Sequence, residues 1–247
     1  ITVATATSDA AGNITSSTVG SFTLDTVAPN TPADAGLDPA SGANGLTKDS
    51  TPVISGTGTA GDTITLLAPD GTTVLGTAVV ATDGTWSITA TSALTDGDNA
   101  LTVQATDPAG NTSTPTTVNV TVDTAPPSAP ANAGLDAASG TGGLTKDSTP
   151  VISGTGATAG DTITLYAPDG TTVLGTALVA ADGSWAVTVA SALPDGVNAL
   201  TVTAKDPAGN ESGTTSLSIT VDATPPAALP NAALDPVSGT GGLTKDN

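Results

Sequence analysis

Apolar and polar residues alternate along short segments of this chain, and turn residues separate the segments. In segment 85–90, Trp86, Ile88 and Ala90 alternate with threonine and serine. A period of two is typical of a half-buried β-strand, and Gly, Pro, Asp and Asn bound such strands. Further strands are predicted over 33–37, 52–58, 62–68, 72–81, 100–105 and 117–123. The pattern therefore predicts about seven short strands in roughly 100 residues.

No segment shows sustained helical periodicity, so the predicted fold is all-β. Seven short strands separated by frequent turns are typical of an antiparallel β-sandwich of the immunoglobulin (Ig) type. Trp86 and its equivalent Trp185 lie in phase with Ile88 and Val187. We therefore expect each tryptophan to fill a sandwich core rather than to form a sugar-stacking platform. Tyr166 is out of phase with its apolar neighbours and is expected to face outward.

The whole pattern repeats with the length of one domain. "LTKDSTPVISGTG" begins at Leu46 and again at Leu144, and Asp25, Asp123 and Asp222 are 98 and 99 residues apart. Such a period matches a complete domain rather than a solenoid unit. We therefore predict sandwiches arranged end to end, with complete repeats at 26–123 and 124–222. Residues 1–25 match the end of a repeat, and residues 223–247 match the beginning of one, as expected of a window cut from a longer array.

Composition excludes several kinds of chemistry. The 247 residues contain no histidine, cysteine or methionine, which excludes Ser-His-Asp and Cys-His catalysis, His-ligated metals and disulfides. There are 23 acidic and 4 basic residues, giving a net charge of −19. Four lysines cannot build a cationic groove, so neither nucleic acids nor anionic membranes are expected partners. No apolar run reaches membrane-spanning length, and the surface should attract cations.

Several segments, taken in order, resemble a known family. They are "TKDSTPVISGTG", "AGDTITLLAPDGTTVLGTAVVATDGTWSIT", "ALTDGDNALTVQATDPAGNTS" and the junction "VDTAPPSAP". Together they resemble the tandem bacterial Ig-like extender repeats of giant type I-secreted adhesins of the RTX type. The resemblance covers the whole chain. It implies an extracellular role at the bacterial cell surface, as a spacer that holds a distal adhesive domain away from the cell, and it implies Ca²⁺ at the domain junctions.

The positions of the acidic residues fit such junctions. In tandem Ig-like sandwiches, the end of one repeat meets the loop between the sixth and seventh strands of the next repeat. The loop between the first and second strands, and the loop between the fifth and sixth, lie at the end of the sandwich where its last strand leaves. Six to eight oxygens at about 2.3–2.6 Å satisfy Ca²⁺. The expected ligands fall into three groups, one for each junction: Asp25, Asp107 and Asn111; Asp123, Asp206, Asn210, Asp38, Asp49 and Asp96; and Asp222, Asp136, Asp147 and Asp195. Asp9, in the first of three equivalent "GN" turns, is expected to be a ligand as well.

The alternative for any of these aspartates is a role in its own turn, since Asp side chains accept backbone N–H bonds in tight corners. We favour that role for Asp70, Asp83, Asp169 and Asp182, which lie in hairpin "DG" turns. The short, proline-rich linkers should make the junctions semi-rigid.

The sequence therefore predicts a non-enzymatic extender segment whose partners are the neighbouring repeats of the same chain. The adhesion target would be bound by domains outside the segment. One alternative is an array of ligand- or glycan-binding modules, which exposed aromatic side chains would mark. Another is a subunit of a self-assembling extracellular filament, in which terminal fragments are completed by strands of neighbouring copies.

Overall fold

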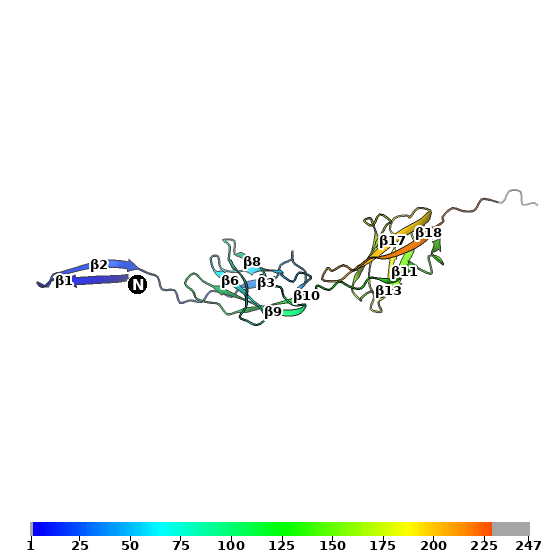
Figure 1. The fold of residues 1–247 in the computed structure, drawn as a ribbon. Coiled ribbons are helices and arrows are strands. Elements are labelled where there is room, and N and C mark those ends of the chain that lie inside the picture. The colour runs from blue at the N-terminus through cyan, green and yellow to red at the C-terminus, as the bar shows by residue number, and fades with distance from the viewer. Residues whose placement is uncertain (1, 229–247) are drawn as a thin grey trace, which may run out of the picture. The chain divides into compact units, whose positions relative to one another are not determined.

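The computed structural model describes residues 2–228, except for the side chains of Val19 and Ser21. Within this range the chain forms strands and loops only (Figure 1). None of it is a helix long and apolar enough to cross a membrane. The chain divides into two compact units, Ile1–Pro127 with Lys205–Ser212, and Ser128–Ala204 with Gly213–Asn247.

The first complete repeat is a sandwich of two sheets. The smaller sheet has the order β3-β5-β8 and the larger has the order β4-β10-β9-β6-β7. All the neighbours are antiparallel except β4 and β10, which run parallel. The strands are β3 (Ala33–Leu37), β4 (Leu46–Thr47), β5 (Val53–Thr57), β6 (Thr63–Leu67), β7 (Val74–Val79), β8 (Thr85–Thr89), β9 (Gly97–Thr106) and β10 (Thr116–Val122).

The second complete repeat has the same topology. Its smaller sheet has the order β11-β13-β16, and its larger sheet has the order β12-β18-β17-β14-β15. The strands are β11 (Ala131–Leu135), β12 (Leu144–Thr145), β13 (Val151–Thr155), β14 (Thr162–Tyr166), β15 (Val173–Leu178), β16 (Trp185–Thr188), β17 (Gly196–Lys205) and β18 (Thr215–Val221).

At the beginning of the chain, β1 (Thr2–Ser8) and β2 (Ile14–Ser21) form an antiparallel hairpin. By sequence they correspond to the last two strands of a repeat, β9 and β10. Two strands cannot enclose a core, so Val3 and Ile14 remain 44% and 73% exposed.

Each sandwich has its own apolar core, built from the alternating positions. In β8, Trp86 and Ile88 are buried whereas Thr85, Ser87 and Thr89 are exposed. The predicted inward positions of the other strands are buried as well, namely Ile64, Leu66, Leu101, Val103, Ala105, Val118, Val120 and Val122. Equivalent residues fill the second core around Trp185. The all-β, tandem Ig-like fold predicted from the sequence is confirmed.

The structure corrects the number of strands. Each repeat has eight strands rather than about seven, because Leu46–Thr47 and Leu144–Thr145 form additional two-residue strands. Each short strand pairs in parallel with the last strand of its own repeat, as in Thr121 with Leu46. The sequence placed these residues in a loop, since two residues are too few for a periodic pattern.

Candidate functional site

The three equivalent "GN" turns share one arrangement. In the second turn, Oδ1 of Asp107 accepts the N–H groups of Ala109 and Asn111 at 2.9 and 2.8 Å. Its Oδ2 accepts Nδ2 of Asn111 at 2.8 Å. Asp9 and Asp206 make matching bonds to Asn13 and Asn210. The Asn111 side-chain bond lowers the pKa of Asp107, and the Asn13 side-chain bond lowers that of Asp9, so these carboxylates are anionic at neutral pH.

The asparagines of the second and third turns also hold the residue that ends the preceding repeat. Nδ2 of Asn111 donates to the carbonyl oxygen of Asp25 at 3.3 Å. Nδ2 of Asn210 donates to the carbonyl oxygen of Asp123 at 2.7 Å. The sequence prediction that these loops meet the preceding strand ends is therefore confirmed for both pairs. A role for these residues as metal ligands stays a prediction.

The aspartates of the opposite loops serve turns or the start of the next linker. Asp96 accepts the Thr124 hydroxyl at 2.9 Å, and Asp195 accepts the Thr224 hydroxyl at 2.7 Å, so both lie beside the strand ends predicted for them. The others accept a backbone N–H two residues further along, namely Asp25, Asp38, Asp49, Asp123, Asp136, Asp147 and Asp222.

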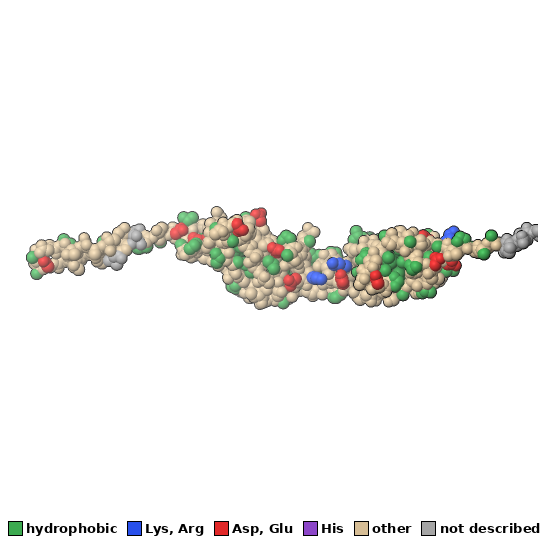
Figure 2. All heavy atoms as spheres, turned by 90° about the horizontal axis from the view of Figure 1, so that it is seen from above, with side chains coloured by type: hydrophobic (Ala, Val, Ile, Leu, Met, Phe, Trp, Pro, Cys, Tyr) green, Lys and Arg blue, Asp and Glu red, His purple; other side chains and the backbone are tan. Residues whose placement is uncertain are grey.

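Within residues 2–228, no three acidic side chains are grouped closely enough to hold a metal ion together. The carboxylates that we expected at one junction therefore do not gather into such a group in this part of the chain. In the view of Figure 2, acidic side chains lie at separate places on the surface of each unit. The reason is local, because each of these carboxylates is engaged by its own turn or by the adjoining linker.

The structure adds one acidic residue that the sequence analysis missed. Asp62, in the turn between β5 and β6, is 4% exposed, and its Oδ2 has no hydrogen-bond partner. Burial, and then the charge of Asp107, raise the pKa of Asp62. A buried carboxylate oxygen without a partner is costly and is usually compensated by a cation or a donor. The signal was present in the sequence, because Asp62 lies in phase with the inward-facing Ile64 and Leu66.

Asp62 lines a concavity of about 450 Å³ on the first unit. Asp25 and Asp107 line the same concavity, together with linker residues 27–30 and the turn residues Thr59 and Ala60. No lysine belongs to this lining. Carboxylate, amide and carbonyl oxygens are the ligands that Ca²⁺ prefers. The unpartnered Asp62 oxygen, in an acidic surrounding, therefore fits a hard divalent cation.

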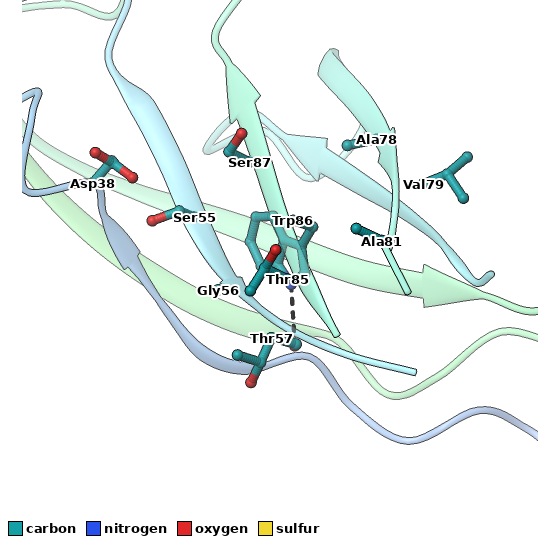
Figure 3. A pocket seen from close by; sticks show the side chains of 10 residues that line it. All are labelled: Asp38, Ser55, Gly56, Thr57, Ala78, Val79, Ala81, Thr85, Trp86 and Ser87. Atoms are coloured by element: carbon teal, nitrogen blue, oxygen red, sulfur yellow. Dashed lines mark hydrogen bonds between the residues drawn. The ribbon is translucent and has the colours of Figure 1, made fainter. Parts of the chain in front are cut away.

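A second concavity lies against Trp86, and Figure 3 shows its lining. It measures about 590 Å³ and is lined by hydroxyl side chains, Asp38 and the edge residues Ala78 and Val79, with an equivalent of the same size beside Trp185. Trp86 itself is only 4% exposed, and its Nε1 donates to the carbonyl oxygen of Thr57 at 3.1 Å (Figure 3). The tryptophan is thus a core residue, as predicted, and offers no face for stacking on a sugar.

The hairpin aspartates are turn residues, as predicted. Oδ1 of Asp70 accepts the N–H groups of Thr72 and Thr73, and its Oδ2 accepts the Thr73 hydroxyl at 2.6 Å. These bonds, that of the Thr73 hydroxyl first, lower the pKa of Asp70 to about 2. Asp169 makes the same bonds, and Asp83 and Asp182 each accept from the residue two positions further along.

Comparison with solved structures gives several similar chains. A "Biofilm associated protein - BSP domain" is 27% identical, with a TM-score of 0.29 over 79% of this chain and 30% of the other. A "tetra-tandem repeat in extending region of large adhesion protein" is 25% identical, with a TM-score of 0.32 over 79% and 50%. This chain thus spans about a third of the length of the first of these chains and half of the length of the second. The chicken CNTN1 FN1-FN3 domains share the fold, at 14% identity and a TM-score of 0.53 over 87% and 73%.

No curated protein gives a significant match to the chain. The model of a family described as "Bacterial Ig-like domain" matches twice, at residues 29–124 and 127–223. These two segments contain the two eight-stranded sandwiches and make up most of the chain. The chain therefore belongs to the bacterial Ig-like domain family and carries two of its domains in tandem.

Proposed function

We propose that this chain is a non-enzymatic extender segment of a large bacterial surface adhesin, which spans the distance between the cell and a distal adhesive domain. The observation that carries the proposal is the tandem of two bacterial Ig-like domains, each with a complete core of its own. Domains that fold around separate cores can be added or removed without disturbing their neighbours, which suits a spacer. An extracellular location at the cell surface follows from that role.

The linker that precedes the first sandwich supports a spacer that resists bending. Its beginning is held by the bond from Asn111 to the carbonyl oxygen of Asp25. Its end is held by the Thr116 hydroxyl, which donates to the carbonyl oxygen of Pro32 at 3.4 Å. Pro29 between these two anchors, and Pro32 at the second of them, restrict the backbone further. A linker held at both ends onto the sandwich that follows it has few conformations left.

The two alternative functions find less support. A glycan-binding array needs an accessible aromatic face on each repeat, but both tryptophans, the aromatic residues that the two sandwiches share, are 4% exposed. The filament alternative needs a sandwich that lacks strands, but each of the two complete repeats encloses its core with eight strands of its own.

Shortening the array tests the spacer function. Deleting residues 26–123 joins Asp25 to Thr124 and preserves the sequence pattern at the junction. Each sandwich should advance the chain by about 35–45 Å, because strands such as the ten-residue β9 rise about 3.3 Å per residue and loops add to each end. We expect small-angle scattering of the shortened chain to give a maximum dimension smaller by one such step, with an unchanged melting temperature for the remaining sandwich.

In a cell-surface protein, the same deletion should bring the distal domain closer to the cell by one step. Tight binding of the isolated 247-residue chain to a host glycan or protein would instead contradict the spacer function and favour a binding module.

We also propose that Ca²⁺ stiffens the segment. In the first unit, the Asp62 carboxylate would hold the ion together with other oxygens of the same concavity, and the ion would supply the positive charge that the buried Asp62 oxygen lacks. At about 100 times its dissociation constant, one bound ion stabilises the folded state by about 2.7 kcal/mol. We therefore expect EDTA to lower the melting temperature and to reduce the maximum dimension in scattering. Identical values in EDTA and in millimolar Ca²⁺ would exclude the calcium role and leave the spacer role to the deletion experiment.

A further inference from the structure

The two repeats differ by one inserted residue beside the buried aspartate. The first repeat runs "GTGTAGD" from Gly56 to Asp62, and the second runs "GTGATAGD" from Gly154 to Asp161. The additional residue is Ala157, which is 8% exposed and belongs to the second core. Gly156, directly before it, has a φ of +80°, a conformation that glycine adopts readily. The insertion is thus accommodated by a local change of backbone direction.

This change gives the two buried aspartates different partners. In the first repeat, Oδ2 of Asp62 has no hydrogen-bond partner. In the second, Oδ2 of the equivalent Asp161 accepts the N–H of Thr158 at 3.2 Å. Asp161 is 2% exposed, so both carboxylates are equally removed from water. The buried charge is therefore compensated by the protein itself in the second repeat but not in the first.

We infer that the first repeat binds Ca²⁺ more tightly than the second, and that the single residue Ala157 sets this difference. The inference rests on the calcium role proposed above, and it identifies Asp62 as the carboxylate that makes binding tighter in the first repeat. A cation at Asp62 would gain an oxygen that no donor competes for, in a concavity also lined by Asp25 and Asp107. A cation at Asp161 would have to displace the Thr158 N–H. A hydrogen bond to a charged group is strong enough to change an affinity by about tenfold or more.

Calcium titration of the full chain by isothermal calorimetry tests the inference, with Asp62→Asn and Asp161→Asn as a matched pair. Asparagine keeps the size of the side chain and removes its charge. We expect Asp62→Asn to weaken the tightest binding step by about tenfold or more and Asp161→Asn to leave that step unchanged. Asp70→Asn is the control, since Asp70 is an exposed turn residue outside the concavity. Melting curves in EDTA show that each variant is folded.

Deleting Ala157 tests the cause of the difference. The deletion gives the second repeat the loop length of the first, where the same loop folds around Trp86. We expect the deleted chain to gain a second tight step that Asp161→Asn then removes. Equal losses from Asp62→Asn and Asp161→Asn, or no gain from the deletion, would overturn the inference and leave the calcium role intact. The absence of any calcium binding to the full chain would overturn both, while the spacer role is judged separately by the deletion of residues 26–123.

Discussion

Replacing Trp86 by alanine should cost the first sandwich about 3–5 kcal/mol of unfolding free energy, the usual range for a buried large aromatic residue. The side chain is 4% exposed and packs in a core with Ile54, Ile64 and Ile88, so its removal leaves a large cavity. Urea denaturation in EDTA measures the loss without a contribution from bound cations. Thr85→Ala, at the exposed neighbouring position, is the control and should stay within about 0.5 kcal/mol of the unsubstituted protein.

The two tryptophans should respond differently to phenylalanine. Nε1 of Trp86 donates to the carbonyl oxygen of Thr57, so Trp86→Phe leaves that oxygen without its donor. Nε1 of Trp185 is buried with no partner, so Trp185→Phe removes an unsatisfied group. We expect Trp86→Phe to cost about 1 kcal/mol more than Trp185→Phe. Equal losses, or a loss below about 1 kcal/mol for Trp86→Ala, would contradict the packing described here.

Sequence alternation predicted the strands well where a strand has one buried and one exposed face. The segment 85–90 matches β8, and its phase placed Trp86 correctly in the core. It could not find β4, because Leu46–Thr47 is held by parallel pairing with β10, some 75 residues further along. Pairing over such a distance leaves no periodic mark on two residues.

The candidate site was predicted less completely than the fold. The sequence placed Asn111 near Asp25 correctly, because the topology of an Ig-like sandwich brings that loop to that strand end. It did not identify Asp62, although an aspartate in an inward-facing phase is a visible anomaly. Nor could it show that Oδ2 of Asp161 accepts a bond and that of Asp62 does not. That difference depends on the backbone path around Ala157, which no residue pattern specifies.

The second large effect is expected at Gly56, which pairs with Trp86 across strands β5 and β8. A Cβ at this position would lie 2.7 Å from Cζ2 of Trp86 and 2.8 Å from the carbonyl oxygen of Ala33. The carbonyl belongs to the paired strand β3 and cannot rotate away, so the clash must displace the indole or separate the strands. We therefore expect Gly56→Ala to destabilise the first sandwich by about 1–3 kcal/mol, the usual cost of overpacking a core.

Gly36→Ala provides the matched control for this prediction. Gly36 lies in β3, pairs with Ser55, and would place its Cβ with no heavy atom within 4 Å. The same substitution there should be neutral or slightly stabilising, because alanine reduces the freedom of the unfolded chain. Chemical denaturation of both variants, with the Trp86 environment followed by near-ultraviolet circular dichroism, separates the two effects. Similar stabilities for Gly56→Ala and Gly36→Ala would show that the indole does not lie against Gly56. The packing of the smaller sheet on the core, as described above, would then be wrong.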